Sequence, residues 1–183
     1  NLPIDYVISP ELEIAKSLQR KLEAPGALDN VPFAENKLRL LEILIDEKCP
    51  IHETKLKELT NKFPNLNAYI LGVIREDSFK ILKKDDKLQH NDKAYVIVNS
   101  NQMEETLKVF GHNEKIANKI LIIGGGNIGF NLASNIENNF EEARVKIIEK
   151  DKNRAEYIAN YLNDTIVING NGLDEDVLNE ANL

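Results

Sequence analysis

The chain has 183 residues and a mass of 20.7 kDa, with 42% hydrophobic and 29% charged residues, enough for one ordinary domain or two small ones. A chain with this many hydrophobic residues can bury a core, which argues against disorder. The formal net charge is −7, and no basic stretch interleaved with aromatic residues offsets it. Nucleic acid is therefore a poor expected partner, because its phosphates would be repelled.

The cysteine content and the apolar runs indicate a cytoplasmic protein. Cys49 is the only cysteine in the sequence, so it can form neither an intramolecular disulfide nor a cysteine-rich zinc site. No basic start leads into an apolar signal core, and the apolar runs fall far short of the roughly 18 residues needed to cross a bilayer. Any membrane role must therefore come through a partner. Because the chain opens at Asn1 and closes just after a helical pattern, we expect a piece of a longer protein.

The first third of the chain contains strands and helices in mixed order. A short buried strand is expected over residues 4–8, followed by a helix that begins at Pro10 and ends before Pro25. Residues 31–45 alternate between apolar and polar side chains more than they follow a helical period, which predicts one or two strands. Helical spacing of apolar residues predicts a short helix over residues 52–63.

The next segment completes a small domain. Strands are expected over residues 68–75, 79–83 and 94–98, separated by polar turns, and a closing helix over residues 101–110. Strands joined by short turns pair antiparallel. Residues 31–110 are therefore predicted to form a compact α+β unit, an antiparallel sheet with helices on it.

After a polar linker at residues 111–117, strands and helices alternate, which predicts parallel βαβ units. The expected fold class is thus α/β: a small α+β lobe followed by a partial Rossmann-type parallel sheet with flanking helices, which stops after three strands. The expected strands are 119–123, 144–148 and 165–168. The first expected helix starts over residues 130–136, and the other two cover 152–162 and 174–181.

A glycine motif follows the first of these parallel strands. Gly124, Gly126 and Gly129 have the Gly-x-Gly-x-x-Gly spacing between a buried strand and a helix, which is the context expected of a dinucleotide site. Such glycines permit a tight turn, a close approach of the backbone to a pyrophosphate, and close packing of the helix on the strand. The N–H groups at the start of the helix, from Asn127 on, would then point at the anion.

An acidic residue ends the second parallel strand. Glu149 lies about 20 residues beyond Gly129, where a carboxylate accepts hydrogen bonds from the adenosine ribose and repels a 2′-phosphate. NAD(H) is therefore favoured over NADP(H), although Lys150, Lys152 and Arg154 are near enough to weaken that preference. The structural alternative is a glycine turn that only joins strand to helix, with Glu149 as a solvated strand end.

A second candidate contact follows the third parallel strand. The loop Asn169-Gly170-Asn171-Gly172 should lie at the carboxyl ends of the strands, beside the glycine turn, where it could flank the adenine. Glycine and asparagine are also ordinary turn residues, so a plain turn before the helix at Asp174 explains it equally well.

The remaining reactive side chains argue against catalysis. His52, His90 and His112 are scattered along the sequence and are expected on the surface. Cys49 is expected to be a small half-buried hydrophobe, because nothing in the sequence supplies a base or a depressed pKa. The acidic turns between residues 85 and 92 lack the spacing of a calcium loop. We therefore expect neither a catalytic residue nor a metal site.

With these residues in view, the sequence resembles the TrkA family, peripheral NAD-binding subunits of Trk potassium-uptake systems built from regulator-of-potassium-conductance (RCK) modules. The resemblance spans almost the whole chain, and its strongest motif is the stretch 120–129. The other matching stretches are 4–11, 25–28, 33–35, Glu149-Lys150-Asp151 with Arg154, and Gly170-Asn171 before 176–178.

The resemblance implies a domain organisation and a set of binding residues. Residues 1–29 would be the end of a first nucleotide-binding lobe with its crossover helix, 30–111 a TrkA-C-like lobe, and 112–183 the start of a second, truncated TrkA-N-like lobe. The family usually has Asp at the place of Asn171, which weakens the case for a contact there. The predicted cofactor-binding residues are Gly124, Gly125, Gly126, Asn127, Ile128, Gly129, Glu149, Lys150, Arg154, Gly170 and Asn171.

The resemblance also implies a function. The chain would belong to a non-enzymatic cytoplasmic subunit, peripheral at the inner face of the plasma membrane, which binds a membrane-embedded Trk-type potassium transport subunit and self-associates into a ring or dimer. Nucleotide occupancy would alter ion flux. Two alternatives share the glycine turn and Glu149: the cofactor-binding portion of an NAD-dependent dehydrogenase, and a potassium-channel regulator that prefers ATP or ADP.

Overall fold

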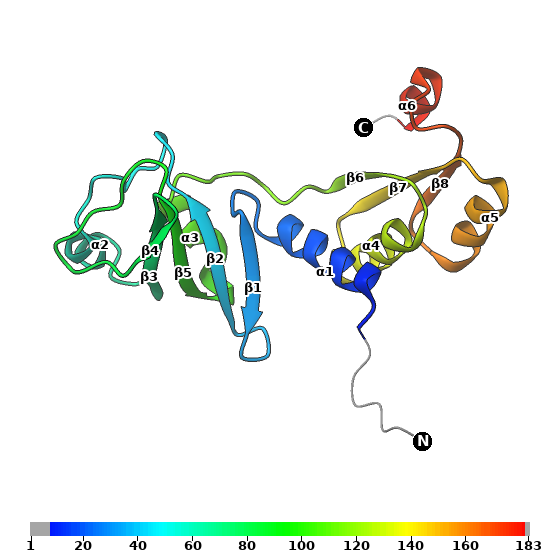
Figure 1. Ribbon diagram of the computed structural model, residues 1–183. Helices are drawn as coiled ribbons and strands as arrows, with labels where there is room; N and C mark the ends of the chain where they lie inside the picture. Colours follow the sequence, from blue (N-terminus) through cyan, green and yellow to red (C-terminus); the bar gives the residue numbers. More distant parts are fainter. Residues whose placement is uncertain (1–7, 182–183) are drawn as a thin grey trace. The chain divides into compact units, whose positions relative to one another are not determined.

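A computed structural model describes residues 8–181, which form two compact units (Figure 1). Residues 20–116 make up one unit, and residues 8–19 and 117–181 make up the other. The strand predicted over residues 4–8 lies outside the described residues, apart from Ile8.

The first helix, α1 (Pro10–Glu23), begins and ends where the sequence predicted. Ser9 accepts a hydrogen bond at its carbonyl oxygen from the Glu13 N–H at 3.1 Å, and acidic residues occupy the first turn and basic residues the last. This charge distribution complements the helix dipole. At the C-terminal end of α1, Glu23 forms an ion pair of 3.0 Å with Arg39.

The unit of residues 20–116 is built on a five-stranded antiparallel sheet in the order β1-β2-β5-β3-β4. Hairpins join β1 to β2 and β3 to β4, and a β-bulge interrupts the pairing of β3 with β5 between Ile70 and Gly72. The strands are β1 (Asp29–Phe33), β2 (Leu38–Leu44), β3 (Ala68–Arg75), β4 (Ser78–Lys80) and β5 (Lys93–Asn99).

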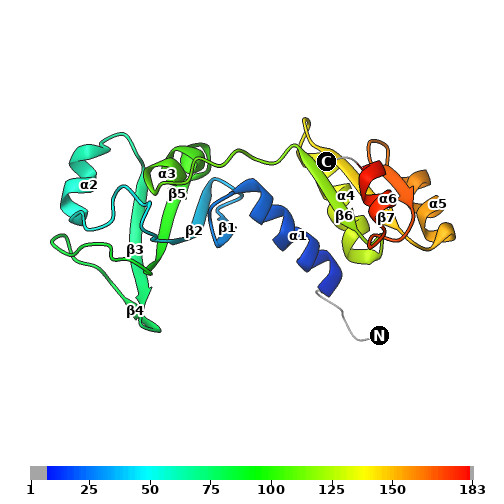
Figure 2. The same ribbon diagram turned by 90° about the horizontal axis from the view of Figure 1, so that it is seen from above.

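Two helices lie beside this sheet, α2 (Leu56–Lys62) and α3 (Met103–Val109) (Figure 2). The 3₁₀ turn η1 (Ser100–Gln102) directly precedes α3. The core lies on one face, where Leu41, Val96 and their neighbours are fully buried together with Leu107 and Phe110 of the α3 region. This arrangement confirms the predicted α+β unit.

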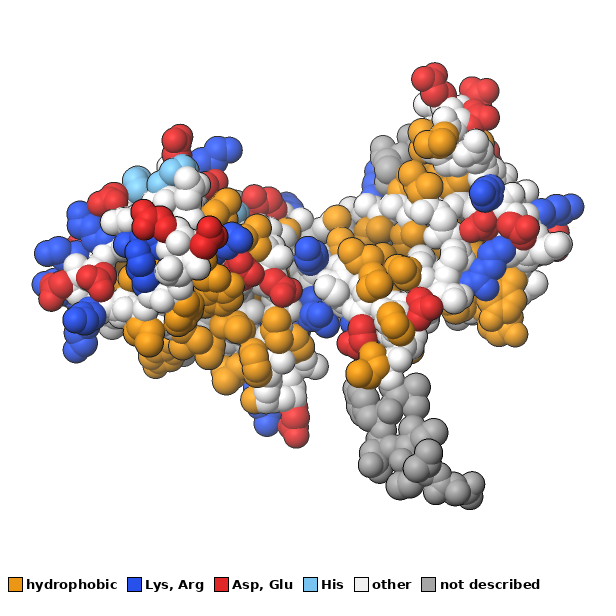
Figure 3. Space-filling model, in the orientation of Figure 1, with side chains coloured by type: hydrophobic (Ala, Val, Ile, Leu, Met, Phe, Trp, Pro, Cys, Tyr) orange, Lys and Arg blue, Asp and Glu red, His pale blue; other side chains and the backbone are white. Residues whose placement is uncertain are grey.

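The opposite face of the sheet carries apolar side chains as well. Leu40 pairs with Val31 and with Ile97, and Ile97 pairs in turn with Tyr69, so these four residues form one row across the strands. Tyr69 is 69% exposed. Hydrophobic side chains gather over this unit in the space-filling view (Figure 3). An apolar sheet face that stays open is typical of a contact surface.

Three predicted boundaries in this unit are wrong. Residues 50–53 form a turn in which Glu53 has φ of +58°, a left-handed conformation that no helix contains, so α2 begins at Leu56 rather than at His52. Strand β4 ends at Lys80 rather than at Lys83. The closing helix begins as a 3₁₀ turn, with the Asn99 side chain accepting from the Asn101 N–H.

The other unit holds a three-stranded parallel sheet in the order β6-β7-β8, as the sequence predicted. Ile148 and Ile168 pack with Ala181 of α6, while Ile147 alternates to the opposite face, on which α4 and α5 lie. The elements are β6 (Lys119–Ile123), α4 (Asn127–Asn139), β7 (Arg144–Glu149), α5 (Lys152–Tyr161), β8 (Ile166–Asn169) and α6 (Glu175–Ala181). Helix α4 thus begins three residues before the predicted start.

The antiparallel unit and the parallel unit together confirm the predicted fold class. Within residues 8–181, no helix combines the length and the apolar character that a membrane span requires.

Candidate functional site

The glycine turn connects β6 to α4. The Gly124 N–H donates to the Ile148 carbonyl oxygen at 2.8 Å, which continues the β6–β7 pairing by one residue. Gly124 has φ of +102°, a conformation that favours glycine, and it turns the chain out of the sheet. Gly126 then caps α4, accepting at its carbonyl oxygen from the Phe130 N–H at 2.9 Å.

Gly126 and Gly129 are glycines for different reasons. A Cβ at Gly129 would lie 2.1 Å from the Gly124 carbonyl oxygen, so packing of the helix against the turn requires glycine there. A Cβ at Gly126 would meet no protein atom within 4 Å. Nothing inside the protein demands glycine at Gly126, but its absent side chain leaves the backbone open to a bound anion at the start of α4.

Glu149 is buried at the end of β7, directly beside the turn. Its Oε2 accepts a hydrogen bond from the Gly125 N–H at 2.7 Å, and its Oε1 accepts from the Asp151 N–H at 2.8 Å. The carboxylate therefore ties the glycine turn to the start of α5. The sequence predicted Glu149 as a ribose acceptor and missed this backbone contact, for which the only signal is an acid at a strand end next to a glycine turn.

Gly125 is enclosed by the same neighbours. A Cβ there would lie 2.1 Å from the Ile158 side chain and 3.2 Å from Glu149 Oε2, so a larger residue would have to displace Ile158 and would crowd the carboxylate.

Arg154 contacts the turn from α5. Its Nε donates to the Gly125 carbonyl oxygen at 2.7 Å, and its guanidinium carbon lies 4.8 Å from the centre of the Tyr157 ring and 5.5 Å from that of Phe130. Cation–π contacts of this kind restrict where the guanidinium can go. The structure thus places the positive charge of Arg154 at the glycine turn.

A small groove of about 180 Å³ opens at the carboxyl ends of the three strands. Gly124, Glu149, Lys150, Gly170 and Asn171 line it, so residues predicted separately from the two loops are brought together. This is the edge at which open parallel sheets bind ligands.

The loop after β8 is held by a hydrogen bond to the end of β7 and by one within the loop itself. The Asn169 side chain donates to the Glu149 carbonyl oxygen at 2.8 Å, and Asn171 Oδ1 accepts from the Leu173 N–H at 3.2 Å. A Cβ at Gly170 would lie 2.8 Å from the Val177 side chain. Of the remaining predicted residues, Asn127 and Ile128 form the first turn of α4, at the open side of Gly126.

The other reactive residues lie apart from this groove. His52 and His90 are exposed, but the prediction of a surface position is wrong for His112, whose side chain packs against Gly26 and is only 15% exposed. Cys49 is fully rather than half buried, and burial raises the pKa of its thiol. Residues 8–181 contain no group of three His, Cys, Asp or Glu side chains arranged to hold a metal ion.

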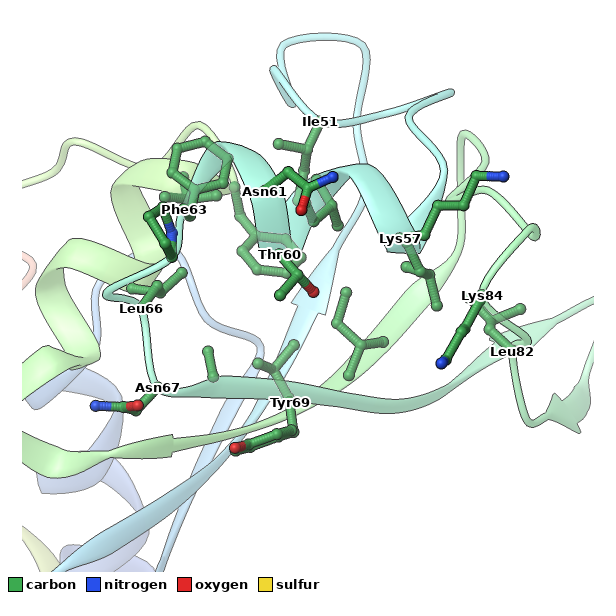
Figure 4. Close-up of a pocket in the computed structure, with 18 residues that line it drawn as sticks. Ile51, Lys57, Thr60, Asn61, Phe63, Leu66, Asn67, Tyr69, Leu82 and Lys84 are labelled. Atoms are coloured by element: carbon green, nitrogen blue, oxygen red, sulfur yellow. The ribbon is translucent and has the colours of Figure 1, made fainter.

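A second, larger groove of about 540 Å³ lies within the antiparallel unit, between α2 and β3 (Figure 4). Sequence reasoning missed it, because its lining consists of ordinary core residues and a few polar side chains of α2.

Two domain-family models match the chain. The TrkA-C domain matches residues 40–111, and the TrkA-N domain matches residues 120–183. The small groove and the glycine turn therefore fall in the TrkA-N match, and the larger groove falls in the TrkA-C match.

Relatives of known name align along nearly the whole chain. The Trk system potassium uptake protein TrkA of Azorhizobium caulinodans is 38% identical over 181 residues, which is 99% of this chain and 40% of that protein. The protein of the same name from Vibrio alginolyticus is 30% identical over 182 residues, covering 39% of its length. This chain therefore spans about two fifths of the length of these relatives.

Solved structures share the fold at low sequence identity. A crystal structure of the GsuK RCK domain superposes with a TM-score of 0.54 at 17% identity, covering 98% of this chain and 37% of that one. A GsuK channel bound to NAD gives a TM-score of 0.53, also at 17% identity, covering 96% of this chain and 30% of that one.

Proposed function

Because residues 40–111 belong to the TrkA-C domain family and residues 120–183 to the TrkA-N domain family, we propose that this chain is part of the regulatory subunit of a Trk-type potassium uptake transporter. In this role it binds NAD(H) and catalyses no reaction. The relatives named Trk system potassium uptake protein support the assignment to potassium uptake.

The glycine turn carries the proposal. Gly126 leaves the start of α4 open, the N–H groups of the first helical turn would donate to a diphosphate bound there, and Arg154 adds positive charge. Glu149 stands at the strand end where its carboxylate would accept hydrogen bonds from a ribose diol, and its charge disfavours a 2′-phosphate. The NAD-bound GsuK channel, which shares this fold, adds support for NAD as the ligand.

Regulation of ion flux requires that the nucleotide bind two conformations of the assembly with different affinity. A coupling free energy of about 1–3 kcal/mol is typical of such systems. We propose that the partner is a membrane-embedded potassium transport subunit, which would place this chain at the inner face of the plasma membrane. The open apolar face of the antiparallel sheet, with Tyr69 and Ile97, supports self-association into a dimer or ring.

The test uses the intact protein and titration calorimetry with NADH. Gly126→Ala should weaken NADH binding at least about tenfold, because the new methyl group would occupy the approach to the helix start. Asn138→Ala is the matched control, since Asn138 is exposed at the far end of the same helix. Unchanged affinity in Gly126→Ala would count against the site.

Two competing functions are tested with the same protein. Hydride transfer to or from the nicotinamide, followed by absorbance, would identify a dehydrogenase instead. Tighter binding of ATP or ADP than of NADH would identify a potassium-channel regulator that prefers those nucleotides, because they present the same ribose and phosphates to Glu149 and the turn.

A further inference from the structure

The groove between α2 and β3 exists because α2 is only loosely packed. None of its residues is fully buried, and its apolar side chains Leu56 and Leu59 are only partly buried against the core. Beneath the helix, Ile70, Val96 and Phe110 form an apolar floor. A volume of about 540 Å³ is within the range of small-molecule sites.

The charges of the groove have one sign. Its lining contains Lys57 and Lys84 but no Asp or Glu, although the chain carries 30 acidic residues and a net charge of −7. Lys57 Nζ is paired with Asp85 at 2.6 Å. The Lys84 ammonium has no carboxylate partner among the described residues, so its charge is the one left for a ligand.

The two ends of the groove differ in character (Figure 4). Lys57 and Lys84 lie at one end, whereas Phe63 and Leu66 lie at the other. Thr60 lies between them, between α2 and β3. A ligand that fits this arrangement has an anionic head at the lysine end and an apolar chain that runs toward Phe63.

We propose that this groove of the TrkA-C domain binds a free amphipathic monocarboxylate, a fatty-acid-like molecule of medium chain length. The carboxylate would accept charge-assisted hydrogen bonds from the Lys84 ammonium. The alkyl chain would replace water on the apolar floor and on the inner sides of Leu59 and Phe63. The nucleotide site takes no part in this binding.

The probes are decanoate and octanoate, titrated into the full chain below their micelle concentrations and followed by calorimetry and by backbone amide NMR. Decanoate should bind about tenfold more tightly than octanoate, because two further methylenes leave water. Amide shifts should centre on residues 56–70. Decyltrimethylammonium, with the same tail and the opposite charge, should bind more weakly than decanoate.

Two variants locate the head and the tail. Lys84→Met should weaken decanoate binding about fivefold, whereas Lys83→Met, which removes the same charge from the neighbouring exposed residue outside the groove, should not change it. Thr60→Phe should abolish binding by filling the groove, and the exposed position of Thr60 leaves the core intact.

Absence of decanoate binding at millimolar concentration would overturn the proposal. So would equal losses in the Lys84→Met and Lys83→Met variants, or amide shifts centred outside the groove, on β1 and β2 around Val31 and Leu40. NADH affinity measured in the same variants should stay constant, so a failure here is distinguishable from a failure of the nucleotide site.

Discussion

The two units of this chain use their sheets in opposite ways. The antiparallel sheet of residues 20–116 puts one face on a core and leaves an apolar row, from Val31 to Tyr69, open on the other face. The parallel sheet carries helices on both faces, so its exposed chemistry is confined to the carboxyl ends of its strands. The antiparallel unit is therefore suited to contacts across a sheet face, and the parallel unit to a ligand at a sheet edge.

The largest expected effect tests whether the antiparallel unit is stabilised independently of the parallel unit. Asp92 is fully buried, and both its oxygens accept hydrogen bonds of 2.7 Å from Arg75. Arg75→Met leaves this carboxylate buried without its partner, which should lower the free energy of unfolding of the unit by about 3 kcal/mol in urea denaturation. Lys87→Met, which removes an exposed cation paired with Glu53, is the control and should cost less than about 1 kcal/mol.

If nucleotide affinity fell together with stability in Arg75→Met, the two units would be energetically coupled rather than independent.

The next effect separates helix packing from nucleotide binding at the glycine turn. Gly129→Ala forces a methyl group against the Gly124 carbonyl oxygen, so the parallel unit should lose about 2 kcal/mol of stability as well as nucleotide binding. Gly126→Ala should lose binding alone, because its Cβ meets nothing. Thermal unfolding and NADH titration of both variants check this difference, and equal stability losses would contradict it.

A smaller effect concerns the Cys49 thiol, whose reactivity reports on the antiparallel unit. Cys49 is buried in the antiparallel unit, and burial raises the pKa of its thiol above the ordinary value of 9.0. A raised pKa means less thiolate at any given pH, so labelling by a disulfide reagent at pH 8 should be at least about tenfold slower than in the urea-unfolded chain. The rate should still increase with pH above 9. Acceleration or slowing by NADH would show that nucleotide binding affects the antiparallel unit.

The smallest effect concerns the exposed pair Lys57–Asp85, with 2.6 Å between Nζ and Oδ1. The hydrogen bond from Lys57 lowers the pKa of Asp85 from its ordinary 3.8. The stabilisation that this pair gives the fold is therefore complete above pH 3.8 and disappears as the pH falls through the lowered pKa of Asp85. The small difference in melting temperature between the wild type and Asp85→Asn should vanish in acid. A difference in melting temperature that persists in acid would have a cause other than this ion pair.

Local patterns predicted most of the elements. Alternation, caps and glycine turns gave the order of strands and helices in both units, because each depends on neighbours in sequence. The start of α2 was predicted too early because Glu53 takes a left-handed conformation that only the surrounding turn imposes. The end of β4 was predicted too late because the apolar Ile81, which is 77% exposed, suggested a longer strand.

The sequence predicted which residues gather at the candidate site but not their contacts. Spacing selected Gly124, Gly126, Gly129 and Glu149 as a site for a diphosphate and a ribose, and the structure brings these residues together at one turn and strand end. The hydrogen bond from the Gly125 N–H to Glu149 and the contact of Arg154 with the turn depend on side-chain positions across two loops. The groove beneath α2 could not be predicted, because it depends on how loosely this helix packs on the sheet and no sequence pattern indicates that.

The double contact of Glu149 has a consequence for binding kinetics and entropy. Because its two oxygens already hold the backbone at Gly125 and at Asp151, the turn has its final shape before any ligand arrives. Binding then requires little ordering of the chain, and the conformational entropy that a flexible loop would lose is already lost in folding. A preorganised turn of this kind should speed association and strengthen the binding of any ligand that fits it.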